Sequence, residues 1–152
     1  MPTRFTLSRQ VAAPPQAVFA IVTNPERVRE CVTAIKAFEV IPPGPVAVGT
    51  KIRETRIMFG REATETFEVA ECDPPSKYTL TAISCGAQYR VEHRFVPDGA
   101  GTRFEIEMTI AGASFFAKLM SPLARLMMRP MKKAIAGDMA AIASAAEKAA
   151  PQ

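Results

Sequence analysis

The stretch from Ser114 to Ala149 constrains the fold more than any other part of the chain, because its apolar residues recur every three or four positions. This spacing is typical of one face of an amphipathic helix of roughly ten turns. The apolar positions are Phe115, Phe116, Leu119, Met120, Leu123, Leu126, Met127, Met131, Ile135 and Ile142. Local contacts cannot cover so long an apolar face. The rest of the chain must therefore supply a broad partner for it.

Three positions interrupt this predicted helix. Pro122 and Pro130 each lack a backbone N–H donor, and Gly137 has a low helix propensity. Residues of this kind bend helices or divide them into segments. We therefore expect a bent or segmented helix, with a hinge near the prolines that would open whatever lies beneath it.

The positive charge of the chain is concentrated in the same region. The chain has 152 residues, a net charge of +4 and a pI of about 9.2, and its length suits one domain. The basic residues of the region, with no acid among them, are Lys118, Arg125, Arg129, Lys132 and Lys133. A solvated helix face explains this pattern, and the alternative is peripheral contact with an anionic membrane. No arginine- and aromatic-rich surface is evident, so no nucleic-acid partner is expected.

Metal and cofactor chemistry find no support in the sequence. Cys31, Cys72 and Cys85 are odd in number and lack the spacing of zinc ligands, and the chain has one histidine. No phosphate-binding or dinucleotide-binding glycine motif is present. We therefore expect no metal and no cofactor. Unpaired cysteines, together with the lack of a membrane-spanning apolar run and of a signal peptide, favour a cytoplasmic protein.

Before the long helix, the chain is divided into one strand, two short helices and six further strands. Proline and asparagine at positions 14, 15, 24 and 25 are typical of helix starts. The expected short helices are Gln16–Val22 and Glu26–Cys31. The expected strands are Phe5–Val11, Ala34–Ile41, Gly49–Phe59, Arg61–Cys72, Lys77–Ser84, Ala87–Val96 and Thr102–Ile110. Short glycine turns between the later strands indicate an antiparallel meander with one covered face.

Gly60 sets a trial register for the first central hairpin. If Met58 faces Ala63, then Arg56 faces Glu65 directly across the two strands. The covered face would then carry Ile52, Glu54, Arg56, Met58, Ala63, Glu65, Phe67 and Val69. A slip of one residue would invert this list.

Gly86 sets the register of the second central hairpin in the same way. If Ser84 faces Ala87, then Tyr78 faces His93. The covered face would gain Tyr78, Leu80, Ala82, Tyr89, Val91, His93 and Phe95. The two hairpins together place ionisable side chains on a face that is otherwise apolar.

Several short motifs, in this order, carry a resemblance to a known superfamily. They are Ala12-Ala13-Pro14-Pro15-Gln16-Ala17-Val18-Phe19, Val48-Gly49-Thr50, Glu71-Cys72-Asp73-Pro74-Pro75, Gly99-Ala100-Gly101-Thr102-Arg103-Phe104 and Leu119-Met120-Ser121-Pro122-Leu123. The chain resembles the START/polyketide-cyclase-like superfamily, which includes the birch-pollen-allergen proteins. One departure is that Cys31-Val32 occupies the region where the superfamily often has a tryptophan.

The resemblance implies an α+β helix-grip fold over residues 1–152, with 151–152 as a disordered tail. A curved seven-stranded antiparallel sheet, two short helices and a long C-terminal helix would enclose a cavity for an apolar small molecule. The superfamily contains carriers, cyclases and regulators, so the fold does not imply one chemistry. Three functions stay open: a carrier or sensor, a cofactor-free cyclase, dehydratase or isomerase, and a membrane- or protein-docking module using the basic helix. Monomer and homodimer also both stay open.

Two groups of polar residues are candidates for chemistry. Glu54, Arg56 and Glu65 form either a structural ion pair or a site in which Arg56 holds a ligand oxygen while a carboxylate moves a proton. His93, beside Tyr78 and Tyr89, is either a hydrogen-bonded core residue or part of a site for a phenol or carbonyl. The candidate catalytic residues are Glu65, His93 and Arg56. The candidate ligand contacts are Glu54, Met58, Phe67, Tyr78, Leu80, Tyr89, Val91, Phe104, Ile106, Met108, Leu119, Leu123 and Met127.

Overall fold

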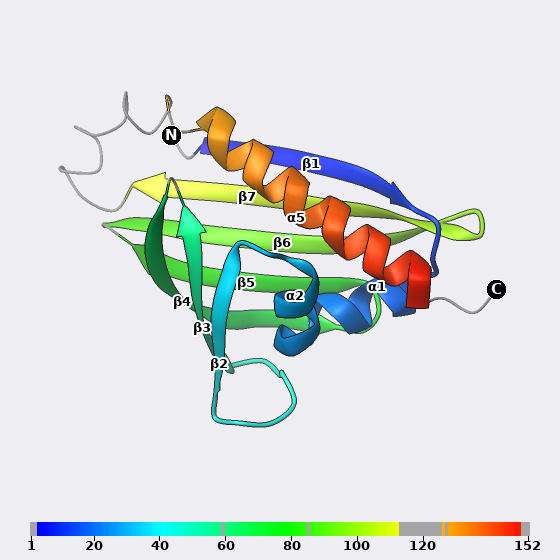
Figure 1. Cartoon of the computed structure of the whole chain (residues 1–152), viewed down its shortest axis with the longest axis horizontal. Helices are drawn as coiled ribbons and strands as arrows, with labels where there is room; N and C mark the ends of the chain where they lie inside the picture. Colours follow the sequence, from blue (N-terminus) through cyan, green and yellow to red (C-terminus); the bar gives the residue numbers. More distant parts are fainter. Residues whose placement is uncertain (1–2, 59, 85, 113–125, 127, 150–152) are drawn as a thin grey trace.

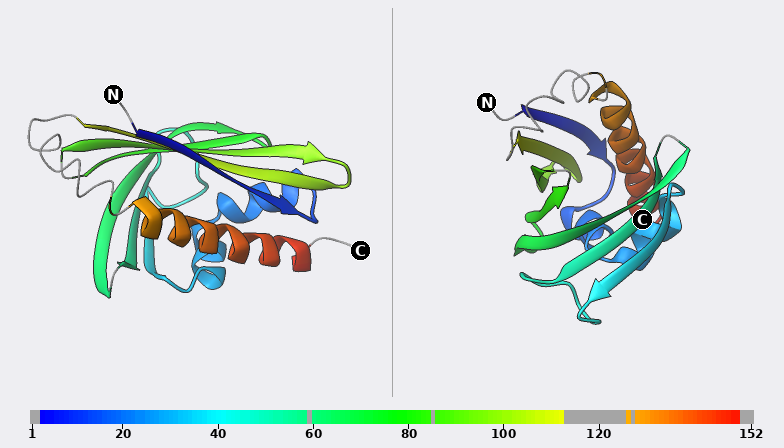
Figure 2. Two further views of the ribbon diagram at one scale, coloured as in Figure 1. Left: turned by 90° about the horizontal axis from the view of Figure 1, so that it is seen from above. Right: turned by 90° about the vertical axis from the view of Figure 1, so that its left-hand side faces the viewer.

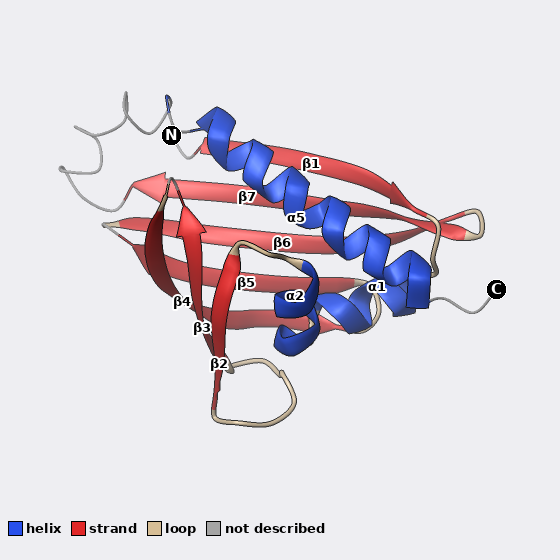
Figure 3. Cartoon of the chain, viewed as in Figure 1, coloured by secondary structure: helices blue, strands red, loops and turns tan. Residues whose placement is uncertain are grey.

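One sheet of seven antiparallel strands carries the fold in the computed structural model, which describes residues 3–58, 60–84, 86–112, 126 and 128–149 (Figures 1 and 3). The strands are β1 Thr3–Val11, β2 Ile35–Ile41, β3 Lys51–Met58, β4 Arg61–Asp73, β5 Lys77–Ser84, β6 Ala87–Asp98 and β7 Gly101–Gly112. The helices are α1 Pro15–Val22, α2 Pro25–Cys31 and α5 Met128–Ala149. The strand order is β1-β7-β6-β5-β4-β3-β2. The predicted α+β helix-grip architecture is confirmed.

The two short helices begin where the prolines predict. Pro15 opens α1 and Pro25 opens α2, at positions where a missing backbone N–H breaks no hydrogen bond of the helix. The side chain of Asn24 caps α2 by accepting a hydrogen bond from the backbone N–H of Arg27 at 3.4 Å. These helices connect β1 to β2, the two edge strands of the sheet.

Helix α5 spans the trough formed by the bent sheet (Figure 2). It runs from Met128 through Pro130 and Gly137 to Ala149 as one helix, so it is not divided into segments at these two positions. The expected helical residues 114–125 and 127, with Pro122, lie outside the described residues. No helix in the described part of the chain is long and apolar enough to cross a membrane.

The tightly packed core lies under the C-terminal half of α5. Met139, Ile142, Ala143 and Ala146 form the buried stripe of the helix. They belong to one apolar cluster that includes Val11, Val18, Ile21, Phe95 and Phe104. The Phe95 ring stacks on Phe104 at 5.3 Å and meets the edge of Phe19 at 5.4 Å. This end of the molecule is filled by side chains and fixes α5 on the sheet.

The predicted register is confirmed for one central hairpin and wrong for the other. Tyr78 pairs with His93 as expected. In the first hairpin, Glu54 pairs with Glu65 and Arg56 pairs with Ala63, so Arg56 does not face Glu65. The reason is a tighter turn, since pairing extends to Met58 and Arg61 around a glycine with a positive φ of 76°. The shift is two residues, so every side chain keeps its predicted face.

Candidate functional site

A cavity of about 330 Å³ lies between the concave face of the sheet and helices α2 and α5. Most of its wall is apolar. The apolar lining residues are Val22, Pro25, Val28, Val32, Ile35, Phe38, Ile52, Met58, Ala63, Phe67, Leu80, Ala82, Val91, Ile106, Met108, Met131, Ala134, Ile135 and Ile142. Strand alternation brings every second residue of β3 and β4 to this wall. Helical spacing brings Met131, Ile135 and Asp138 of α5 to the opposite side.

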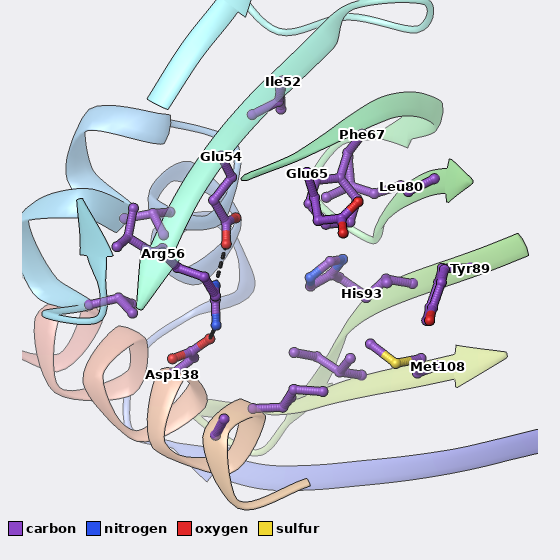
Figure 4. Close-up of a pocket in the computed structure, with 18 of the residues that line it drawn as sticks. Ile52, Glu54, Arg56, Glu65, Phe67, Leu80, Tyr89, His93, Met108 and Asp138 are labelled. Carbon is purple, nitrogen blue, oxygen red and sulfur yellow. Dashed lines mark hydrogen bonds and ion pairs between the residues drawn. The ribbon is translucent and has the colours of Figure 1, made fainter. Parts of the chain in front are cut away.

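A cluster of three charged side chains occupies one side of the cavity (Figure 4). Arg56 on β3 donates from Nε to Glu54, two residues away on the same strand. Its Nη1 donates to Oδ2 of Asp138 on α5 at 3.0 Å. The three side chains are between 15% and 21% exposed, so water screens them only in part. The positive charge of Arg56 is therefore paired with two carboxylates of the protein.

Burial and the opposite charges together shift the pKa values of the three residues in this charged cluster. Removal from water raises the pKa of Glu54 and of Asp138, and the Arg56 charge opposes that rise without cancelling it. Burial alone would lower the pKa of Arg56, but the two carboxylates outweigh it and the guanidinium stays protonated. With both carboxyls ionised the cluster carries one net negative charge.

Glu65 adds a further carboxylate beside the cluster. It is the register partner of Glu54, and its Oε1 accepts a hydrogen bond from Ser84 Oγ at 2.7 Å. Its predicted partner Arg56 is engaged by Asp138 instead. Figure 4 shows Glu65 on the side of the cavity away from Asp138, near Phe67 and Leu80. The cavity thus presents carboxylates from two strands and one helix.

His93 lines the cavity as a neutral ring. Its Nδ1 lies 3.0 Å from the backbone carbonyl oxygen of Tyr78, which can only accept, so Nδ1 carries the proton. The residue is 9% exposed, and burial lowers its pKa to about 4. Nε2 is therefore a hydrogen-bond acceptor at neutral pH. No described residue hydrogen-bonds to that nitrogen.

Two tyrosines complete the polar part of the wall. Burial raises the pKa of Tyr78, so its phenol stays neutral, and its ring lies 5.6 Å from the His93 ring. Tyr89 lines the cavity from β6, and Figure 4 shows it beyond His93, next to Met108. No group of three or more His, Cys, Asp or Glu side chains that could hold a metal occurs among the residues the structure describes.

A family model described as polyketide cyclase/dehydrase and lipid transport matches residues 2–147. The chain belongs to this family. The resemblance seen in the sequence is therefore confirmed, and the cavity belongs to a fold that binds apolar small molecules. A search of curated proteins finds no match.

Solved structures of family-like proteins share the fold at low sequence identity. The Zhui aromatase/cyclase from Streptomyces sp. R1128 is 14% identical, with a TM-score of 0.80 over 97% of this chain and 95% of that chain. Norcoclaurine synthase from Thalictrum flavum, in complex with dopamine and hydroxybenzaldehyde, is 16% identical, with a TM-score of 0.74 over 100% and 90%. The di-domain aromatase/cyclase StfQ from the steffimycin pathway is 11% identical, with a TM-score of 0.82 over 97% and 52%.

Most residues predicted for the family cavity lie on its wall. The structure brings together Glu54, Arg56, Met58, Glu65, Phe67, Tyr78, Leu80, Tyr89, Val91, His93, Ile106 and Met108. Phe104 was expected there but is fully buried and packed between His93 and Phe95, because β7 enters the filled core at that point. Leu119, Leu123 and Met127 lie outside the described residues. The catalytic and ligand-contact roles of all these residues stay predictions.

Sequence reasoning expected apolar side chains of the long helix in the family cavity, but it missed an acidic residue of that helix and the short-helix region. Asp138 is the most consequential omission, since it holds Arg56. The sequence did contain a signal for this residue, because Asp138 is an acidic residue between Ile135 and Ile142 on the apolar face of the long helix. The residues from β2 and the short-helix region, with Ser84 of β5, were also missed: they are Val22, Pro25, Val28, Val32, Ile35, Phe38 and Ser84.

Proposed function

We propose that the protein binds an apolar small molecule, of lipid, polyketide or aromatic type, in the cavity between the sheet and α5, as a carrier or sensor. One observation carries this proposal: a cavity of about 330 Å³ with a largely apolar wall lies beside the cluster of buried apolar side chains that forms the core. Small-molecule sites typically have volumes of ~300–1,000 Å³, apolar walls and a few polar groups that orient the ligand. The flexible side chains of Met58, Met108 and Met131 suit ligands of varied shape.

The engagement of the polar groups favours binding over catalysis. Arg56 already pairs with two carboxylates, and their negative charges offset the positive charge that it could offer to an oxyanion developing during a reaction. His93 is a weak base because burial keeps its pKa near 4. A carrier needs neither group to react.

Native mass spectrometry of the purified protein, followed by solvent extraction, tests the proposal directly. The expected result is a co-purified apolar molecule, or binding of added 2-naphthol with one site per chain. Ala134→Trp should abolish that binding, because residue 134 lines the cavity from α5. Ala136→Trp, two residues along on the exposed side of the same helix, is the matched control and should bind as the wild type does. Absence of any ligand and of naphthol binding would overturn the proposal.

Cofactor-free acid–base catalysis is a second candidate function, and the placement of His93 and Glu65 on one wall of the cavity favours it. The Tyr78 carbonyl fixes the Nδ1–H tautomer, which leaves Nε2 able to accept a proton from a bound molecule. Glu65, hydrogen-bonded to Ser84, is a second proton acceptor on the same wall. The reaction class would be proton abstraction next to a carbonyl, as cyclisation, dehydration and isomerisation all require.

Deuterium incorporation into 2-tetralone measures this chemistry without knowledge of the natural substrate. The protein should speed exchange at the carbons next to the carbonyl above the buffer rate. His93→Asn or Glu65→Gln should then lower the protein-catalysed rate by roughly 10²-fold. Exposed Glu68→Gln on β4 is the matched control for Glu65. A tetralone complex that exchanges no faster than buffer would exclude this function and leave the carrier proposal standing.

A further inference from the structure

The charged groups of the cavity are unequal in number. Among its described lining residues, the carboxylates of Glu54, Glu65 and Asp138 stand against one guanidinium, that of Arg56. Both hydrogen bonds recorded for Arg56 go to Glu54 and Asp138. The charge of Arg56 is therefore already matched by protein carboxylates, and a ligand anion entering the cavity would meet surplus negative charge.

The hydrogen-bonding groups of the wall show the same bias. Carboxylates only accept hydrogen bonds, and the neutral His93 ring, 9% exposed, offers Nε2 as a further acceptor. The hydroxyl of Ser84 donates to Glu65, so that donor is directed to the protein. The tyrosine hydroxyls can donate or accept. A ligand that donates hydrogen bonds therefore fits this wall better than one that only accepts them.

Aromatic rings border the acidic region. Phe67 on β4 and Tyr89 on β6 lie on the same side of the cavity as Glu65, and Phe38 and Tyr78 line it from β2 and β5 (Figure 4). The faces of such rings attract organic cations, most strongly where water is excluded. An apolar wall, surplus carboxylates and aromatic faces together match a molecule that has an apolar body and a positively charged end.

We infer that the cavity selects an organic cation: an apolar, aromatic-type molecule bearing a protonated amine rather than a carboxylate. This inference rests on the proposed binding function and specifies its ligand class. The amine would lie between Glu65 and the Glu54–Asp138 side of the wall, donating to carboxylate oxygens and to His93 Nε2. The apolar body would lie against the methionine and leucine side chains of the sheet. Fatty acids and other carboxylates would be disfavoured.

Three matched naphthalene probes test the inference by calorimetry at pH 7: 2-(1-naphthyl)ethylamine, 2-(1-naphthyl)ethanol and 1-naphthylacetic acid. We expect the amine to bind at least about 10-fold more tightly than the alcohol, and the acid at least about 10-fold more weakly. Glu65→Gln and Asp138→Asn should each reduce the amine-to-alcohol affinity ratio by about 5-fold or more. Glu68→Gln, on the exposed face of β4, should keep the wild-type ratio.

The outcomes separate the inference from the proposed function. Binding of the alcohol with no preference for the amine would overturn the cation selectivity and leave the binding function intact. An amine preference that survives both Glu65→Gln and Asp138→Asn would also overturn it, because the selectivity would not come from these carboxylates. Failure of all three probes to bind, with no co-purified molecule, would overturn the binding function itself.

Discussion

Arg56 Nη1 on β3 lies 3.0 Å from Asp138 Oδ2 on α5, so one ion pair joins the sheet to the helix at the cavity wall. The two residues are 82 positions apart in the sequence. Glu54 holds the same guanidinium from within β3, which fixes its direction toward the helix. This contact ties α5 to the sheet beside the cavity and contributes to the charge of the wall.

Removal of Arg56 should destabilise the protein at neutral pH. In Arg56→Met, Glu54 and Asp138 would remain partly buried without their cation, and we expect a loss of about 2–4 kcal/mol in the free energy of unfolding. Burial already raises both carboxyl pKa values above their unfolded values. Protonation therefore favours the folded state, and the loss should shrink as the pH falls from 7 to 5. Urea unfolding at both pH values measures this.

A neutral cluster provides the control for that variant. In Glu54→Gln/Arg56→Met/Asp138→Asn no charge is left unpaired, so most of the lost stability should return at pH 7. A triple variant as unstable as Arg56→Met would show that the Arg56 side chain acts through packing rather than through its charge.

The single histidine of the chain allows a direct test of the site by NMR. Because burial lowers the pKa of His93 to about 4, its ring resonances should stay in the neutral form down to about pH 5. Nitrogen shifts should identify Nδ1 as the protonated nitrogen, as the hydrogen bond to the Tyr78 carbonyl requires. A titration near pH 6.5 would mean that the ring is exposed to water and that the wall differs from the one described.

The same histidine should make the protein less stable in acid. Its folded pKa lies below the unfolded value of about 6.5, so the unfolded chain binds the proton first and stability falls as the pH drops from about 6.5 to 4. The full effect is about 3 kcal/mol. Glu54 and Asp138 act in the opposite direction over part of this range. The comparison is therefore the pH slope of His93→Asn against that of the wild type, and equal slopes would contradict the prediction.

Thr102 should be important for the start of β7. Its Oγ1 donates to the Ala13 carbonyl oxygen at 2.7 Å, and the side chain is fully buried. Thr102→Val keeps the shape but removes the donor, and we expect a loss of about 1–3 kcal/mol by thermal or urea unfolding. Thr66→Val, at an exposed position on β4, should change stability by less than about 0.5 kcal/mol.

The membrane-docking alternative makes its own prediction. Arg129 and Lys133 are exposed on α5, whereas Lys132 lies over the Phe5 ring at 5.2 Å, and Lys118 and Arg125 lie outside the described residues. Docking requires that anionic vesicles at low salt retain more protein than neutral ones. Each exposed basic residue should contribute about 1 kcal/mol to the free energy of binding to the anionic surface. Arg129→Gln/Lys133→Gln should lower that retention, and Lys36→Gln/Lys51→Gln, exposed on β2 and β3, should not. Equal retention by both vesicle types would exclude docking.

The fold was predictable because its signals are local. Strand alternation, proline at helix starts and glycine turns each act over a few residues, and they gave the order of the elements and the covered face of β3 to β6. The cross-strand partner of Arg56 could not be predicted from such local signals. It depended on whether the turn around Gly60 held two or four residues, which the sequence leaves open.

The candidate site was predictable only where the sheet forms it. The contribution of Asp138 depends on the rotation and height of α5 over the sheet, and packing of Met139, Ile142 and Ala143 against the filled core sets both. Such packing is collective and leaves no short motif. Phe104 illustrates a different limit. Strand alternation predicted correctly that its side chain lies on the covered face of the sheet, but alternation does not distinguish a residue of the cavity wall from a residue of the core.

The strand order has a consequence for how the protein forms during synthesis. The hairpins from β2 to β7 can pair as they leave the ribosome, but β1 pairs with β7, and that partner follows it by roughly a hundred residues. At a rate of synthesis of about 5–20 residues per second, β1 remains without its partner strand for on the order of ten seconds. Helix α5 comes later still, so the apolar concave face is open to water until α5 has been synthesised. A ligand or chaperone that reaches the nascent chain in this interval meets a trough that the finished protein no longer exposes.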